Sequence, residues 1–343
     1  MTKQKLGQFY TTNYDYILQN MCIPNNVKNI IEPFTGEGDL LKFINIKNYN
    51  LELYDIDPKY NGTVKCDTLY NPPNYDNKFV LTNPPYLARN KNTDKTLYDK
   101  YNTNDLYKCF IINLINSLCL GGIIIIPLNF ISSIRKSDIE LRKQFINKFD
   151  IITLNIFEEQ VFNDTSYTVC SLQFELKKSI KNSISTNIHI YPNNIKCNVI
   201  FGEINDYTIG GEIYNLPKNN KIKIERATSK NSNNSNITNI LVKCIDDNIN
   251  STIGLSWVSN ENIYIDNTPK LSARSYATLI IEPKLNEEEQ KKLICDFNNY
   301  MTKMRTKYNS LFLTNYRESN TIARKRISFQ LVYDICNYLL SSK

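Results

Sequence analysis

The sequence predicts an α/β protein, with a seven-stranded sheet in its first half and a separate basic α+β domain in its second half. Short apolar runs alternate with helical patterns over the first 176 residues, which is typical of strands and helices in turn. The last two runs are joined directly, so the last strand should lie antiparallel to its neighbour. From about residue 177 the periodicity weakens and Asn, Lys and Ser become frequent. We therefore expect one domain over residues 1–178 and another over residues 179–343.

The composition sets broad limits on the class of protein. With 343 residues, 41% of them hydrophobic and 22% charged, the chain should fold as a soluble globular protein. No apolar run approaches the roughly 20 residues of a membrane span, and the polar start lacks a secretory signal, so we expect an intracellular protein. The nine cysteines include no CxxC pair, and His189 is the single histidine. This argues against a metal site and against catalysis by a histidine base.

The most informative stretch is residues 80–86, Val-Leu-Thr-Asn-Pro-Pro-Tyr. The apolar start reads as a buried strand, and two prolines end it because they lack amide hydrogens and have a fixed φ. Asn83, Pro84, Pro85 and Tyr86 are then placed at the carboxyl end of a strand, where open α/β sheets bind ligands. An amide, a stiff turn and an aromatic ring at that edge predict a clamp for a flat polar ring. Residues 71–74 repeat Asn-Pro-Pro without a strand or an aromatic, and we interpret them as a plain loop.

Other strand ends carry polar residues of a nucleotide-binding kind. Residues 27–31 form the first strand, and the loop that follows contains Glu32, Gly36 and Gly38 before a helical segment. This loop matches neither a dinucleotide fingerprint nor a P-loop. Asp55 ends the second strand, where related folds hold a ribose diol. Asp67 ends the third, where it could accept a hydrogen bond from an exocyclic amine or cap a loop.

The rest of the first half completes the alternation. Residues 89–105 are polar and predict a mobile loop beside the site. A helix over residues 106–118, a strand at 123–126, a charged helix at 136–148 and strands at 151–157 and 167–176 follow. A capping box at Asn286 and Glu289 predicts a helix to about Tyr308, and the tail predicts another from Ser328 to Leu340.

The net charge of +7 lies wholly in the second half. Residues 1–174 hold 18 basic and 18 acidic residues, whereas residues 175–343 hold 23 and 16. Basic residues interleaved with aromatics suit phosphate contacts and stacking, although a solvated face explains any one of them equally well. The expected DNA-contact residues are Lys221, Lys223, Arg226, Arg305, Arg317, Arg324, Lys325 and Arg326.

The motifs, taken in order, resemble a known family. LGQFYTT, EPFTGEG, YDID, Asp67, TNPPY and VFNDTSYTVCSL follow one another over about residues 6–176. This order is similar to that of N6-adenine DNA methyltransferases of the gamma-ordered amino-methyltransferase group, as in type II restriction-modification systems. Two positions depart from the family's pattern. Thr12 stands where the family usually has proline, and Phe34 where a small residue is frequent.

The resemblance implies a Rossmann-like sheet that binds S-adenosylmethionine, duplex DNA as partner and a C-terminal target-recognition domain. A cognate restriction endonuclease is a further partner that it implies. Asn83, Pro84, Pro85 and Tyr86 would form the catalytic motif, with Tyr86 stacking on the target base. Phe162, or Tyr167 in its place, would pack on that base as a second aromatic. The cofactor-binding residues carried over by motif are Tyr10, Thr11, Glu32, Gly36, Gly38, Asp55 and Asp67.

The chemistry of these residues agrees with methyl transfer to an amino group. The Asn83 side-chain oxygen and the Pro84 carbonyl could both accept from adenine N6, which would aim its lone pair at the methyl group. The base would have to be flipped out of the duplex. An RNA adenine methyltransferase, a protein-glutamine methyltransferase and a non-catalytic nucleic-acid-binding protein remain alternatives. The N-terminal LGQFYTT and the basic second half favour DNA.

Overall fold

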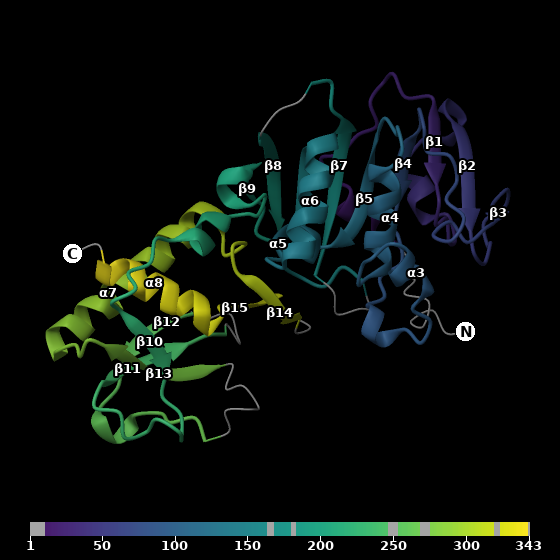
Figure 1. The fold of residues 1–343 in the computed structure, drawn as a ribbon. Helices are drawn as coiled ribbons and strands as arrows, with labels where there is room; N and C mark the ends of the chain where they lie inside the picture. The colour runs from purple at the N-terminus through teal and green to yellow at the C-terminus, as the bar shows by residue number, and fades with distance from the viewer. Residues whose placement is uncertain are drawn as a thin grey trace. The chain divides into compact units, whose positions relative to one another are not determined.

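The computed structural model describes residues 11–162, 168–179, 183–245, 253–267, 275–318 and 323–341. The chain divides into two compact units, one up to Tyr207 and one from Thr208 onward (Figure 1). Within the described residues, no helix is long and apolar enough to cross a membrane.

The first unit is built on a nine-stranded sheet with the order β3-β2-β1-β4-β5-β7-β6-β8-β9. The five strands from β1 to β5 run parallel to one another, whereas β7 is antiparallel to both β5 and β6. β8 then pairs in parallel with β6, and β9 closes the edge antiparallel to β8. The strands are β1 (Asn29–Glu32), β2 (Asn50–Asp55), β3 (Val64–Lys65), β4 (Phe79–Thr82), β5 (Gly121–Pro127), β6 (Phe149–Phe157), β7 (Val169–Leu176), β8 (Ser183–Tyr191) and β9 (Ile195–Gly202).

This sheet corrects two expectations. The seven expected strands are present and the seventh is antiparallel, but β8 and β9 extend the sheet to nine. The boundary between the units therefore lies at Tyr207 and Thr208 rather than after residue 178. The reason is the alternation in β8, where Ile184, Ile188 and Ile190 are buried while the residues between them include exposed polar side chains. This alternation is that of a strand with one buried face, and β8 takes its place in the first sheet by pairing in parallel with β6.

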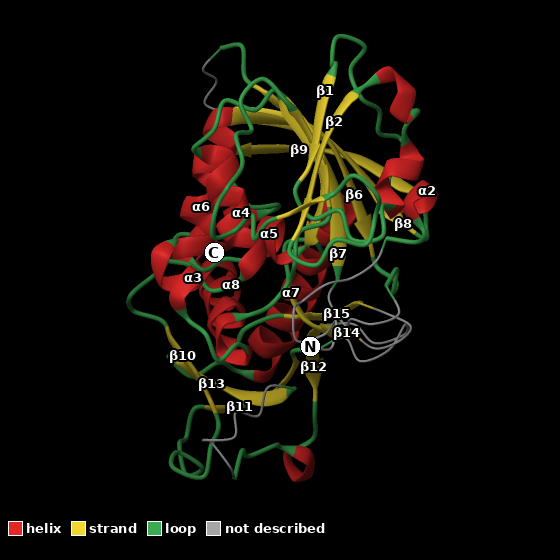
Figure 2. Ribbon diagram, turned by 90° about the vertical axis from the view of Figure 1, so that its right-hand side faces the viewer, coloured by secondary structure: helices red, strands yellow, loops and turns green. Residues whose placement is uncertain are grey.

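Helices flank the sheet and bury its apolar strands. α4 (Leu106–Ile115), α5 (Asn129–Ser132) and α6 (Lys136–Lys148) lie on one face, and α2 (Tyr14–Ile17) lies on the other (Figure 2). On the side of α6, the rings of Phe145, Phe149 and Phe174 pack with centroids 4.9–5.1 Å apart. Short helical turns complete the unit: η1 (Asp39–Phe43), η2 (Ile46–Asn48), η3 (Arg89–Lys91), α3 (Thr96–Lys100) and η4 (Glu203–Asn205).

The second unit contains a four-stranded antiparallel sheet with the order β10-β13-β11-β12. The long helix α7 (Glu287–Tyr308) packs on β11 and β12, and α8 (Phe329–Ser341) packs on β10. The predicted capping box is present, since the Glu289 amide donates to the Asn286 side chain and the Asn286 amide donates to Glu289, each at 2.9 Å. The four strands of this sheet are β10 (Lys223–Arg226), β11 (Ile237–Lys243), β12 (Gly254–Trp257) and β13 (Tyr276–Glu282). The remaining elements are η5 (Gly211–Asn215), η6 (Asn260–Asn262), β14 (Thr314–Glu318) and β15 (Ala323–Arg326).

Candidate active site

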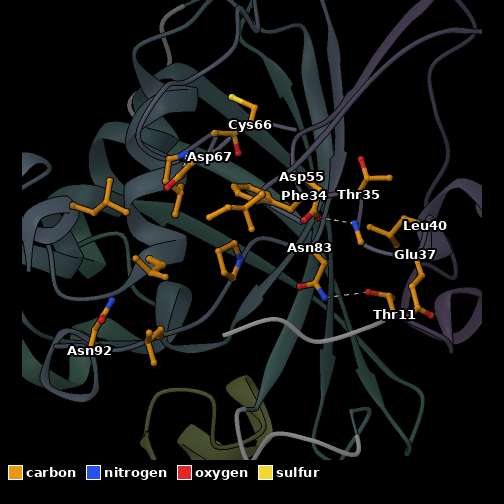
Figure 3. Close-up of a pocket in the computed structure, with 18 of the residues that line it drawn as sticks. Thr11, Phe34, Thr35, Glu37, Leu40, Asp55, Cys66, Asp67, Asn83 and Asn92 are labelled. Atoms are coloured by element: carbon orange, nitrogen blue, oxygen red, sulfur yellow. Dashed lines mark hydrogen bonds between the residues drawn. The ribbon is translucent and has the colours of Figure 1, made fainter. Parts of the chain in front are cut away.

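The carboxyl ends of β1, β2 and β4 meet at one edge of the first sheet, because these strands are parallel neighbours. A cavity of about 380 Å³ opens there (Figure 3). Glu37 and Thr11 lie at one end of it, Asn83 near the middle and Asn92 at the other end. The predicted site residues that line this cavity are Thr11, Gly36, Asp55, Asp67, Asn83 and Pro85.

Asp55 fixes the glycine loop. Its carboxylate is almost fully buried and accepts hydrogen bonds from the Gly36 amide and the Asp57 amide, each at 2.8 Å. Gly36 and Gly38 both have positive φ, of 55° and 78°, which favours glycine over residues with a Cβ. A Cβ at Gly38 would lie 2.3 Å from the Tyr60 ring. Gly36 lines the cavity, whereas Gly38 serves the turn behind it.

Glu32 lies behind the cavity wall rather than on it. The side chain is fully buried at the end of β1, and the Thr82 hydroxyl and the Phe34 amide donate to its Oε1. Its Oε2 is buried without a hydrogen-bond partner among the described residues. Burial raises the pKa of Glu32 to about 8, so the carboxyl group is protonated at neutral pH. Glu32 thus ties the end of β1 to the residue that precedes Asn83.

Asp67 presents its carboxylate from a tight turn. One oxygen, Oδ1, accepts from the Leu69 and Tyr70 amides at 3.1 Å each. The neighbouring Thr68 also lines the cavity, and its hydroxyl donates to the Pro33 carbonyl at 2.9 Å. The turn therefore holds the carboxylate of Asp67 at the cavity wall.

The Asn-Pro-Pro-Tyr motif is ordered by its own hydrogen bonds. Asn83 donates from Nδ2 to the Thr11 hydroxyl at 3.0 Å, and its Oδ1 faces the Tyr86 hydroxyl, which donates to it. The Tyr86 hydroxyl also contacts the Ile125 carbonyl at 2.7 Å. Tyr86 is 1% exposed and does not line the cavity, so this conformation offers no open ring face for stacking.

The second expected aromatic is also buried. Phe162 is 4% exposed and lies outside the cavity, and its carbonyl accepts from the Gln160 side chain at 2.9 Å. Tyr10 and Tyr167 lie outside the described residues. Both expected aromatics that the structure describes are therefore buried.

The sequence interpretation missed one wall of the cavity. Asn92, Thr93, Asp94 and Leu97 line it, from the segment that was expected only to be a mobile loop. Their polar character was visible in the sequence. Nothing in the pattern showed that this segment folds back over the cavity.

The expected DNA-contact residues of the second unit differ in their exposure and in their partners. Lys221 and Lys223 are exposed. Arg226 pairs with buried Asp266 at 3.3 Å, Arg305 donates to the Ile253 carbonyl at 2.8 Å, and Lys325 is 5% exposed. These three side chains are engaged inside the unit. Arg326 is half-buried, and the side chains of Arg317 and Arg324 lie outside the described part of the chain.

Comparison with known proteins identifies the kind of catalytic domain. Residues 8–162 match the family described as Eco57I restriction-modification methylase. This part of the chain thus matches a methyltransferase family of the restriction-modification kind, which confirms the expected resemblance at that level. S-adenosylmethionine is its cofactor, as expected. No curated protein matches the chain.

Similar solved structures are distant. A modification subunit of a putative type I restriction enzyme from Vibrio vulnificus has a TM-score of 0.41 at 12% identity, over 60% of this chain and 51% of that one. A putative class I S-adenosylmethionine-dependent methyltransferase from Listeria monocytogenes has a TM-score of 0.38 at 12% identity, over 51% and 61%. A type I methyltransferase subunit from Streptococcus thermophilus has 0.37 at 15%, over 53% and 47%. The chain thus spans about half the length of these proteins, and similarity at this level does not identify a substrate.

Proposed function

We propose that this methylase domain transfers a methyl group from S-adenosylmethionine to the N6 amino group of adenine in a short, specific site of duplex DNA. One observation carries the proposal. Asn83, at the head of an Asn-Pro-Pro-Tyr turn, lines the same cavity as the carboxylates of Asp55 and Asp67. An amide acceptor for an amino group and two acids for a nucleoside therefore share one site.

The residues present fit the cofactor. Buried Asp55 suits a ribose diol, because each of its oxygens keeps a lone pair beyond the amide that it already accepts. Asp67 keeps Oδ2 for an exocyclic amine, since Oδ1 serves its own turn. Phe34 and Ile56 supply apolar cavity wall for a purine ring, and Gly36 allows close approach of the backbone. When bound, the cofactor supplies an electrophilic methyl group on sulfur.

The chain's own groups would act mainly by orientation. Adenine N6 is a weak nucleophile because its lone pair is delocalised into the ring. Acceptance of its two hydrogens by Asn83 Oδ1 and the Pro84 carbonyl localises that lone pair and points it at the methyl group. The two prolines restrict φ, so both acceptors are held before the base arrives. The proposal assigns no step to a histidine or a metal ion.

Binding of the base requires a change at Tyr86. Its hydroxyl donates to Asn83 Oδ1, and its ring packs edge-on against Tyr107 with the centroids 6.3 Å apart. For stacking, the ring must leave this position, and Asn83 Oδ1 then becomes available to the adenine amino group. A flipped base gains about 1–3 kcal/mol from an aromatic face. Phe162 is the proposed second face, on the segment that leads into β7.

The second unit is proposed to dock the DNA. Exposed Lys221 and Lys223 provide phosphate contacts of the sequence-independent kind. A cognate restriction endonuclease that cleaves the unmethylated site belongs to the same proposal, motivated by the matched family.

Transfer of a tritiated methyl group to duplex DNA, RNA and protein tests the function, with Asn83→Ala as control. Label on duplex DNA, recovered as N6-methyladenine and lost in Asn83→Ala, is the expected result. Label on RNA or on glutamine would replace the proposed substrate by one of the alternatives. Unchanged labelling by Asn83→Ala would contradict the proposed role of the turn.

A further inference from the structure

A segment that we call the bridging loop, residues 88–105, joins the catalytic and cofactor halves of the site. An antiparallel bridge between Ala88 and Asp105 closes its base, and the Arg89 amide donates to the Asn104 carbonyl at 2.9 Å. It contains η3 and α3, and part of it, including Leu97, forms a wall of the cavity. Only Leu87 separates its base from the Asn-Pro-Pro-Tyr turn, and the residues at the end of α3 contact the turn of Asp67.

Tyr98 makes the contact at the catalytic end. Its side chain is fully buried, and its hydroxyl donates to the Leu87 carbonyl at 2.9 Å. Burial raises the pKa of Tyr98 to about 12. Leu87 follows Tyr86 directly, and its amide donates to Asp105 Oδ1 at 3.1 Å. Leu87, the residue after the Asn-Pro-Pro-Tyr turn, is therefore held by hydrogen bonds at both its amide and its carbonyl.

Tyr101 makes the contact at the cofactor end. Its hydroxyl donates to the Leu69 carbonyl at 2.8 Å, and the ammonium of Lys100 donates to the Tyr70 carbonyl at 2.8 Å. The amides of Leu69 and Tyr70 donate the hydrogen bonds that Asp67 Oδ1 accepts. The bridging loop thus holds the backbone carbonyls of Leu69 and Tyr70, and the backbone amides of the same two residues orient Asp67.

We propose that Tyr98 and Tyr101 are positioning residues with separate tasks. Tyr98 holds the turn that would bind the methyl-accepting base, and Tyr101 holds the turn of Asp67, which would bind the cofactor. The Tyr98 task rests on the proposed function, whereas the Tyr101 task requires only the cofactor. Each hydroxyl acts through one backbone carbonyl, so Phe at either position removes the bond and keeps the ring.

The test compares Tyr98→Phe and Tyr101→Phe with Tyr214→Phe. Tyr214 is a matched control in the second unit, where its hydroxyl donates to the Phe312 carbonyl at 2.7 Å. Calorimetric titration gives the Kd for S-adenosylmethionine, and single-turnover transfer at saturating cofactor gives the methylation rate. Each variant's melting temperature reports the structural effect that all three share.

The two variants should affect different quantities. We expect Tyr101→Phe to raise the cofactor Kd about fivefold with the saturated rate unchanged within twofold, because one hydrogen bond to the Asp67 turn is lost. We expect Tyr98→Phe to lower the saturated rate about tenfold with the Kd unchanged within twofold. Tyr214→Phe should change neither quantity, although its melting temperature should fall as well.

Other outcomes would overturn the assignment. If both variants behave like Tyr214→Phe, the hydroxyls are structural only. If both variants lost methylation rate and cofactor affinity to the same extent, the two tyrosines would have no separate tasks. If the wild-type protein labels RNA or protein instead of DNA, the proposed substrate is wrong. The methylation rate of Tyr98→Phe is then measured on that acceptor, and it still decides whether Tyr98 positions the turn. The Kd of Tyr101→Phe for S-adenosylmethionine decides the role of Tyr101 whichever acceptor is methylated.

Discussion

Removal of the Tyr86 hydroxyl separates two roles of this side chain. In the structure the hydroxyl donates to Asn83 Oδ1 and contacts the Ile125 carbonyl at 2.7 Å, inside a fully buried setting. The proposed reaction uses the ring, which must first leave that setting. Tyr86→Phe deletes the anchor and keeps the ring, whereas Tyr86→Ala deletes both.

The two variants should therefore differ in rate. Loss of a buried hydrogen bond costs about 1–3 kcal/mol of folding stability, and Tyr86→Phe should melt at a lower temperature accordingly. The same loss makes it easier for the ring to move out, so its single-turnover methylation rate should stay within threefold of wild type. Tyr86→Ala forfeits stacking worth about 1–3 kcal/mol and should be slower by roughly tenfold or more.

A neighbouring tyrosine provides the control. The Tyr107 hydroxyl is buried without a partner among the described residues, and its ring contacts that of Tyr86. Tyr107→Phe removes a hydroxyl from the same place without breaking a hydrogen bond, so it should alter neither rate nor stability appreciably. If Tyr86→Phe proved as slow as Tyr86→Ala, the hydroxyl rather than the ring would be the active part, and the stacking role would be refuted.

Three further predictions follow from the site and the second unit. Asn83→Ala should lower the saturated methylation rate by roughly 10²–10³-fold, as expected for one lost acceptor, while the cofactor Kd from calorimetry changes little; an equal loss in both would assign Asn83 to cofactor binding instead. Because burial raises the pKa of Glu32 from its ordinary 4.5 to about 8, the folded protein retains a proton that the unfolded chain releases, so the free energy of unfolding should fall by roughly 3–5 kcal/mol as pH rises from 4.5 to 8. Glu32→Gln should flatten that part of the denaturant-derived stability profile, and an unaltered slope would contradict the assignment. Lys221→Ala and Lys223→Ala should each reduce the slope of log affinity for duplex DNA against log salt by about 1, and a flat salt dependence in the wild-type protein would count against docking there.

The sequence predicted best those features that depend on a few consecutive residues, such as the end of a strand. The ends of β1, β2 and β4 were found because an apolar run followed by glycine, acid or proline marks a strand end in any context. Parallel pairing then brought Asp55 and Asn83 to one edge, as expected. The helix capped by Asn286 was predictable for the same reason, since its signal lies within four residues.

What depended on distant partners was not predictable. Nothing local distinguishes a lysine on the surface from Lys325, which is buried, or shows that Arg226 faces Asp266 forty residues further along the chain. The burial of Tyr86 depends on the Ile125 carbonyl of the next strand. The wall from Asn92 to Leu97 depends on carbonyls at residues 69 and 87, which lie outside the segment itself.

The pairing of β6 on both sides has a consequence for how the chain acquires its structure. β6 is an inner strand only because β8 returns to it in parallel, after β7 has already paired on its other side. A chain ending at residue 178 would leave β6 with a row of unpaired amides and carbonyls, and such open edges recruit other chains. A growing or shortened polypeptide is therefore prone to self-association until β8 and β9, residues 183–202, have been added. Solubility of the first unit should thus appear between lengths of 178 and 207 residues, well before the second unit is complete.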